Sequence, residues 1–229
     1  MAKENSATQI LNGLREPLEN YGFKQNKSEK EFRRRTDFGF QRVLLTGRSP
    51  SRGQAATGLP LYECTIILQI RFESVETILL PLELIIGNKN QKNASTVSRV
   101  IYGYYPFRRF RDRPIKIGYK NPKKDLEKVI IRAQKMLSSD GQNWFKKYSD
   151  IQACETEINS APAWEATNLI ANSERRIYNG IALAALCKGS EYANEIAGKY
   201  VNALHQIKNI PPDSRKRVEN KINILCEQV

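Results

Sequence analysis

The segment from Tyr104 to Arg113 has the residue types that recognise nucleic acid. It interleaves four aromatic side chains with four arginines, and lysines at 116, 120, 123 and 124 follow it. A guanidinium group binds a phosphate through two parallel hydrogen bonds, and an aromatic ring stacks on a base. The sequence therefore predicts a basic aromatic–arginine surface, which consists of Tyr104, Tyr105, Phe107, Arg108, Arg109, Arg111, Arg113, Lys116 and Lys120.

Two further groups of arginines are candidates for the same surface. Arg33, Arg34 and Arg35 follow one another on a predicted strand, and Arg48 and Arg52 lie in a polar loop rich in Gly, Pro and Ser. If these groups join the first one, they form a single face that binds a polyanion. We expect the partner to be nucleic acid, with an acidic protein as the alternative.

Two other interpretations account for the same residues. Tyr and Arg are typical hot-spot residues of protein interfaces, so the chain is alternatively an immunity or adaptor module for an acidic protein. In the other interpretation the aromatic rings pack in the core, and the arginine stems cover apolar surface while their charged heads stay in water. The sequence alone leaves these alternatives open.

The sequence shows no recognisable catalytic motif. The chain has one histidine, His205, so any Ser-His or Cys-His nucleophile would have to use it. It has no Gly-rich phosphate loop. An unrecognised metal-dependent nuclease is a second alternative, with strand carboxylates at Glu31, Asp37 and Glu63, but these are widely dispersed.

The four cysteines predict neither a disulfide framework nor a metal site. Cys64, Cys154, Cys187 and Cys226 are scattered and have no CxxC spacing, so we expect buried thiols and no cofactor. No segment approaches the ~20 apolar residues of a membrane span. The first residues also lack an apolar signal core, which predicts a cytoplasmic protein with no membrane partner.

The positive charge is concentrated in one part of the chain. Residues 101–150 carry 13 basic and 5 acidic side chains, whereas residues 151–229 carry 9 of each, within an overall net charge of +13. A local excess of this kind indicates a polyanion or an acidic partner more strongly than an even distribution does.

Hydrophobic periodicity predicts the N-terminal elements. A helical stripe comprises Ile10, Leu11, Leu14, Leu18 and Tyr21. Pro17 should kink or shorten that helix, and Gly22 should end it. Residues 31–36 and 38–45 read as two strands, with a bulge or off-centre turn at Gly39. Residues 62–72 read as a central strand with both faces covered.

The later part of the chain is predicted to contain short helical turns and strands first and helices after them. Residues 73–80 predict one or two helical turns, residues 96–105 and 115–119 two strands, and Pro122 the start of a helix. Residues 142–163 read as connecting structure in which Trp144 and Phe145 anchor onto the core. Three helices are expected after this connection, over residues 173–187, over 191–207, and from Pro211 onward.

The N-terminal pattern resembles a known family. The run Leu14, Leu18, Gly22-Phe23-Lys24 and Phe32-Arg33-Arg34, with Trp144 to Tyr148 after the later helix, resembles a bacterial family of unknown function numbered four-three-zero-four. The resemblance covers about residues 6–150 and implies no established activity, so it assigns no functional residues.

Together these patterns predict an α+β fold. We expect a mainly antiparallel sheet flanked by an N-terminal helix and a later helix, and then a C-terminal helical unit. The expected domains are an α+β domain over residues 1–160 and a helical hairpin with a final helix over residues 161–229.

Overall fold

The chain divides into two compact units that interleave along the sequence. The computed structural model describes residues 6–26, 28–48, 62–86, 94–102, 115–117, 122–170 and 172–229. Unit 1 comprises residues 1–69 and 99–145, and unit 2 comprises residues 70–98 and 146–229. These bounds differ from the expected domains, because residues 70–98 and 146–160 contribute helices that pack against the C-terminal helices.

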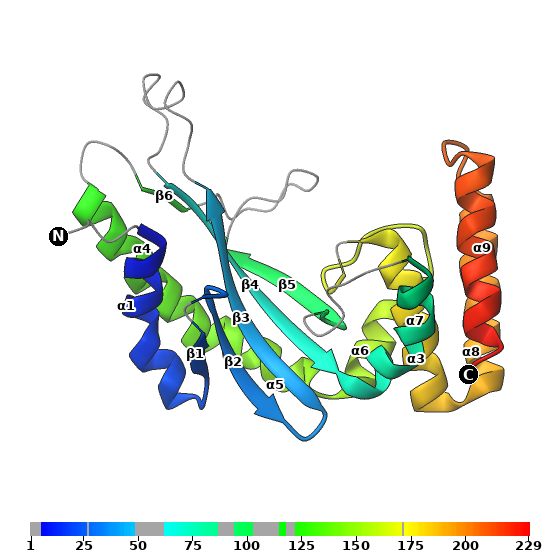
Figure 1. Cartoon of the computed structure of the whole chain (residues 1–229), viewed down its shortest axis with the longest axis horizontal. Helices are drawn as coiled ribbons and strands as arrows, with labels where there is room; N and C mark the ends of the chain where they lie inside the picture. Colours follow the sequence, from blue (N-terminus) through cyan, green and yellow to red (C-terminus); the bar gives the residue numbers. More distant parts are fainter. Residues whose placement is uncertain are drawn as a thin grey trace. The chain divides into compact units, whose positions relative to one another are not determined.

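The fold is α+β, as predicted, with a mainly antiparallel sheet (Figure 1). The strands follow the order β1-β2-β3-β4-β5, and β6 pairs with β4. Their bounds are β1 Lys24–Asn26, β2 Glu31–Thr36, β3 Gly39–Arg48, β4 Tyr62–Phe72, β5 Val97–Tyr102 and β6 Ile115–Ile117. The last residues of β4 and the first residues of β5 belong to unit 2.

The hairpin of β2 and β3 is regular. Thr36 pairs with Gly39 across the turn, and the register continues without interruption to Glu31 opposite Leu44. The bulge expected at Gly39 is therefore wrong, because Asp37 and Phe38 alone form the turn and Gly39 already pairs.

Strand β4 is central, but its two faces differ. Ile66, Leu68 and Ile70 are buried, whereas Thr65 and Ile67 between them are partly exposed. The expectation that both faces are covered is thus right for one face only. In unit 1 the helices α1 (Ser6–Asn20) and α4 (Pro122–Met136) contact each other, and α1 also contacts β1 and β3 (Figure 1).

Helix α1 continues through Pro17 to Asn20 instead of ending early. Proline has no N–H, so it leaves the carbonyl of Gly13 without its helical donor. The side chain of Gln134 on α4 supplies a replacement, since its Nε2 donates to the Gly13 carbonyl oxygen at 2.7 Å. The turn after the helix is closed by Gly22, whose φ of 79° suits glycine and whose amide bonds the Glu19 carbonyl.

Helix α4 continues into further helical structure, where a connection was expected. A π-helical turn, Leu137–Gly141, follows α4, and α5 (Gln142–Tyr148) and α6 (Ile151–Asn159) come next. The prediction for residues 142–163 was wrong here because these helices are too short for a periodic signal. Trp144 and Phe145 are buried, as expected, and the Phe145 ring lies 5.4 Å from the Phe23 ring.

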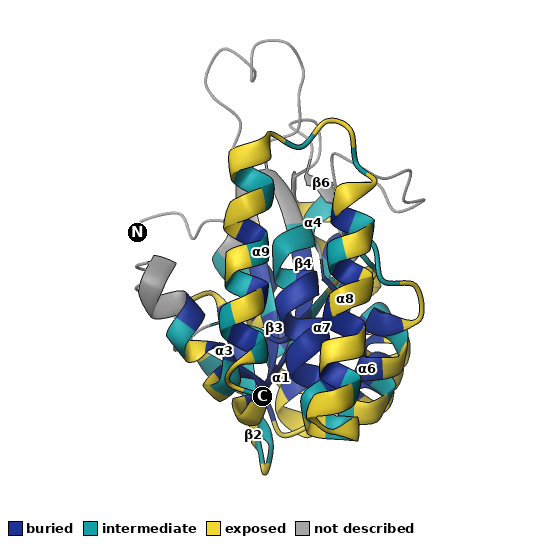
Figure 2. Cartoon of the chain, turned by 90° about the vertical axis from the view of Figure 1, so that its right-hand side faces the viewer, coloured by how far each residue is buried: buried dark blue, intermediate teal, exposed yellow. Residues whose placement is uncertain are grey.

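Unit 2 contains α3 (Glu73–Ile86), α6, α7 (Ser173–Lys188), α8 (Ser190–His205) and α9 (Pro212–Cys226). The three C-terminal helices confirm the predicted ones within two residues. Helix α7 packs against each of the others and is buried along most of its length, whereas α8 and α9 have exposed outer faces (Figure 2). Thus α7 is the core element of this unit.

A buried polar cluster joins α6, α7 and α8. The Tyr200 hydroxyl donates to Asn159 Oδ1 at 3.0 Å, and Asn159 Nδ2 donates to the Gly180 carbonyl at 2.9 Å. The Arg176 guanidinium donates to the backbone carbonyls of Ile158, Ala161, Ala163 and Glu165. Arg176 therefore closes the C-terminal end of α6 and fixes the connection to α7.

We expect Gly180→Ala to destabilise unit 2 by about 1–3 kcal/mol. A Cβ at this position would lie 2.6 Å from Asn159 Oδ1 and 2.8 Å from the Tyr200 hydroxyl. Gly198→Ala on α8 is the matched control, since a Cβ there meets nothing within 4 Å. It should stabilise the protein by up to about 1 kcal/mol. Urea denaturation measures both; equal effects would show that the close approach at Gly180 is unimportant.

Alkaline pH should destabilise the same cluster. Burial raises the pKa of the Tyr200 hydroxyl to about 12, compared with about 10 in the unfolded chain. Below about pH 10 the hydroxyl is protonated in both states, so it does not change the free energy of unfolding. Between about pH 10 and 12 only the unfolded chain loses this proton, so the free energy of unfolding should fall, by at most about 3 kcal/mol. Denaturation curves at several pH values measure the fall, which should be smaller in Tyr200→Phe.

Candidate nucleic-acid interface

The three consecutive arginines of β2 do not share one face. Because side chains alternate along a strand, Arg33 and Arg35 point to one side of the sheet and Arg34 to the other. Arg34 Nη1 donates to the Tyr21 carbonyl at 2.6 Å, its other nitrogens bond Gln41 Oε1, and its guanidinium lies over the Phe23 ring. Arg34 thus closes the turn after α1, while Arg35 is exposed.

Arg33 is engaged by the protein's own carboxylate. Its Nη2 lies 2.9 Å from Glu31 Oε1, and its guanidinium stacks on the Phe40 ring at 4.3 Å. The other Glu31 oxygen pairs with Arg42 Nη1 at 3.2 Å. Arg42, which the sequence did not single out, also donates to Gln69 Oε1 at 2.6 Å. Glu31, Arg42 and Gln69 thus link β2, β3 and β4.

Charge balance explains why Arg42 tolerates burial. Burial lowers the pKa of Arg42, and the Glu31 carboxylate opposes that shift. Both side chains are almost fully buried, so each needs the other to offset its loss of hydration. Arg33 and Arg42 therefore stabilise the sheet, and the Glu31 carboxylate offsets part of their charge.

Most of the predicted aromatic–arginine surface lies outside the described residues. This applies to Arg52, Tyr104, Tyr105, Phe107, Arg108, Arg109, Arg111, Arg113 and Lys120. Arg48 is the last residue of β3, and Lys116 lies in β6 opposite Glu63 of β4. Arg33 pairs with Arg42, six residues before Arg48 on β3, which corresponds to about 20 Å along the strand. The structure therefore separates Arg33 to Arg35 from Arg48.

A second group of cations lies on α4, which contacts β6. Lys124, Lys128 and Lys135 are exposed, together with Lys123 and Arg132. Residues spaced by four and seven positions share one face of a helix, so Lys124, Lys128 and Lys135 form a stripe about 16 Å long. We call these three residues the α4 lysine stripe. Among the described residues, none of the three forms an ion pair.

The inner face of α4 explains the orientation of the stripe. Val129 and Ala133 are buried against unit 1, and the lysines lie on the opposite side of the helix. The sequence had indicated only Lys123 and Lys124 at the start of this helix. The spacings of four and seven positions between Lys124, Lys128 and Lys135 were the signal that marked the rest of the stripe.

Two of the carboxylates named for a nuclease, Glu31 and Asp37, do not converge, and the side chain of the third, Glu63, lies outside the described part of the chain. Glu31 begins β2 and Asp37 follows its last residue, so about 20 Å of strand separates them. Glu31 is bound to arginines, and Asp37 Oδ1 accepts from the Phe38 amide in an exposed turn. Within the described residues, no group of three potential metal ligands is found.

The environments of His205 and of the described cysteine side chains indicate structural roles. His205 Nε2 lies 2.8 Å from Glu219 Oε1, which links α8 to α9. Cys154 is buried and bonds the Tyr148 carbonyl, while Cys187 and Cys226 are half-buried, and all three are free thiols. Cys64 lies in β4, and its side chain is outside the described part of the chain.

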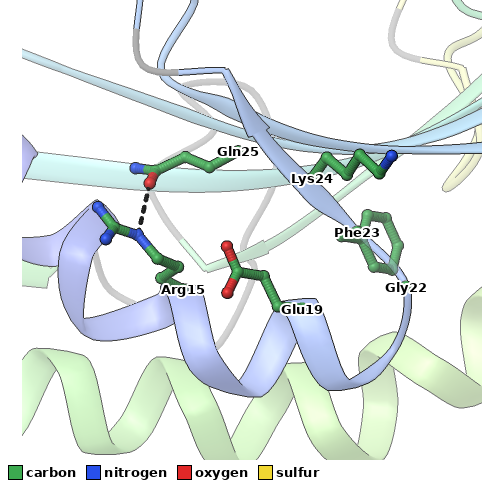
Figure 3. A pocket seen from close by; sticks show the side chains of 6 residues that line it. All are labelled: Arg15, Glu19, Gly22, Phe23, Lys24 and Gln25. Carbon is green, nitrogen blue, oxygen red and sulfur yellow. Dashed lines mark hydrogen bonds between the residues drawn. The ribbon is translucent and has the colours of Figure 1, made fainter.

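One pocket of unit 1 is formed by the end of α1 and the start of β1. It has a volume of about 570 Å³ and is lined by Arg15, Glu19, Gly22, Phe23, Lys24 and Gln25 (Figure 3). Arg15 Nε donates to Gln25 Oε1 at 2.8 Å, so these two side chains point toward each other, and Lys24 extends away from them. Two cations and one carboxylate line this pocket, and one of the cations, Arg15, is already engaged by Gln25.

A larger groove of about 800 Å³ lies between α1 and α4. It is lined on one side by Gly13, Glu16, Pro17 and Tyr21, and on the other by Ile131 and Lys135, among others. Tyr21 and Ile131 are exposed although they are large apolar residues. The groove therefore places apolar surface beside the α4 lysine stripe.

No protein-family model, curated protein or solved structure matches the chain. The resemblance to the bacterial family of unknown function stays a prediction. In the structure, the Gly22-Phe23 step that carries it ends α1 and inserts a buried ring beneath Arg34. Among the described residues, no helix is long and apolar enough to cross a bilayer.

Removal of the Glu31 carboxylate should destabilise unit 1 strongly. Glu31→Gln leaves Arg42 buried without its ion-pair partner, which should cost about 3–5 kcal/mol. Glu195→Gln is the control, because Glu195 pairs with Lys199 on the exposed face of α8 and such pairs contribute less than about 0.5 kcal/mol. Thermal or urea denaturation measures both variants. A similar small effect in the two variants would contradict the structural role of Glu31.

Proposed function

We propose that the protein binds nucleic acid through the exposed basic face of α4. The α4 lysine stripe carries the proposal, because its cations are exposed, aligned and not neutralised by the described part of the protein. Helix α4 carries two acidic side chains, Asp125, which is partly buried, and Glu127, which is exposed, against five basic ones. Cations aligned along a helix suit a polyanion, whose phosphates recur at regular intervals.

The contrast with unit 2 supports this choice of surface. Several of its cations are held by carboxylates of the same unit: Arg175 by Glu76, Lys188 by Glu155, and Arg217 by Glu174. Residues 151–229 have no net charge. The excess positive charge therefore belongs mostly to unit 1, in which residues 101–145 carry 11 basic and 4 acidic side chains.

The segment from Tyr104 to Arg113 fits the same proposal as a second contact. Its aromatic and guanidinium groups suit stacking and phosphate binding. Along the chain it lies between β5 and β6, and β6 contacts α4. In this proposal the segment contacts the same nucleic acid as the α4 lysine stripe.

Neutralisation of the α4 lysine stripe should abolish most of the binding. In Lys124→Gln/Lys128→Gln/Lys135→Gln, affinity for a labelled oligonucleotide should fall at least tenfold at low salt. The slope of log K against log salt should decrease by about 2, since three phosphate contacts are lost. Fluorescence anisotropy at about 50 and 200 mM salt measures both quantities.

The control has the same change in net charge in unit 2. Lys199, Lys208 and Lys216 are exposed there, and the triple Lys→Gln variant at these positions should retain its affinity within about twofold. Equal losses in the two triple variants would show that only overall charge matters. A folded wild-type protein that binds no nucleic acid at either salt concentration would overturn the proposal.

A further inference from the structure

The exposed apolar residues of unit 1 gather in one place. Among the described residues, four large apolar side chains are exposed, and two of them, Leu80 and Leu186, belong to unit 2. The other two, Tyr21 and Ile131, are 37% and 65% exposed, and both line the groove between α1 and α4. The turn after α1 and helix α4 each supply one of these residues, so exposed apolar surface from two segments meets at one groove, which indicates a ligand surface.

The backbone that carries Tyr21 is fixed. Its carbonyl accepts from Arg34 Nη1 at 2.6 Å, and its amide donates to the Leu18 carbonyl at 3.1 Å. Across the groove, the bond from Gln134 to Gly13 holds α4 against α1. The backbone at both walls of the groove is therefore held by hydrogen bonds, so a ligand would not have to order these segments first.

The two walls of the groove differ in charge. Among the lining residues, α4 contributes Lys135, the last member of the α4 lysine stripe, whereas α1 contributes Glu16 and no cation. An anionic backbone should therefore follow α4 and avoid α1. The part of the ligand that faces Tyr21 should be uncharged and apolar or aromatic.

We propose that this groove binds single-stranded nucleic acid, with phosphates along the α4 lysine stripe and bases against Tyr21 and Ile131. The inference rests on the proposed function and adds the class of nucleic acid. A single strand has free base faces that stack on an aromatic ring, whereas a duplex buries those faces within its own stack. Lys135 on one wall, with the rest of the α4 lysine stripe along the same helix face, and the exposed Tyr21 ring provide both kinds of contact.

The test compares single and double strands of about 16 nucleotides. Tyr21→Ala should weaken binding of the single strand between about 5- and 100-fold, the range for loss of one stacked base, and should leave duplex binding unchanged. Tyr21→Phe keeps the ring and should bind as the wild type does. Glu16→Gln should tighten binding of the single strand, because it removes a negative charge from the groove.

Leu186→Ala is the matched control, since Leu186 is similarly exposed but lies in unit 2; it should leave both affinities unchanged. Circular dichroism verifies that each variant is folded. If the wild type binds single and double strands equally and Tyr21→Ala has no effect, the inference is wrong. In that case sensitivity to the lysine variants would still support the proposed function, whereas no binding by the wild type would overturn both.

Discussion

The hydrogen bond from Gln134 to the Gly13 carbonyl is the contact on which the arrangement of unit 1 depends. Pro17 removes a backbone donor from the middle of α1, and an unsatisfied carbonyl at a helix–helix contact is costly. Gln134 supplies the missing donor from α4. Gly13 makes the contact close, since a Cβ there would lie 2.7 Å from the Ile130 side chain. Pro17, Gly13 and Gln134 thus meet at the contact between α1 and α4, on a different side of α4 from the lysines.

The buried carboxylates of the protein are paired with basic side chains. Glu31, Glu76 and Glu155 are buried, and each contacts at least one basic side chain. A buried carboxylate without such a partner would lose its hydration energy with nothing to offset it. Arginines and lysines that pair with these buried carboxylates therefore stabilise the fold. The cations of α4 lie on a helix face with few acids and stay accessible.

The sequence predicted the elements with a strong periodic signal and missed those decided by tertiary contacts. The first helix, the hairpin, β4 and the C-terminal helices follow from hydrophobic spacing, turn residues and helix caps. The short helices α5 and α6 carry too few turns for periodicity to reveal them. The continuation of α1 through Pro17 depends on Gln134, 117 positions further along the chain, and no local pattern reports such a partner.

At the candidate site, too, the sequence revealed the charge but not the tertiary contacts. The charge excess around α4 was visible from composition, and Lys124 was already noted. The structural roles of Arg33 and Arg34 were not visible, because they depend on Glu31, on Gln41 and on the carbonyl of Tyr21. Consecutive arginines in a sequence suggest a common surface, but a strand directs neighbouring residues to opposite sides.

The four carbonyl partners of Arg176 have a consequence for acid solutions. Carboxylate partners lose their charge when they become protonated, so the ion pairs elsewhere in the chain weaken as acid is added. A backbone carbonyl stays a hydrogen-bond acceptor in acid, so the four bonds of Arg176 do not depend on the charge of a carboxylate. The junction between α6 and α7 therefore keeps its bonds when the ion pairs fail. The C-terminal end of α6 is therefore less sensitive to acid than the contacts that depend on the carboxylates of Glu76 or Glu174.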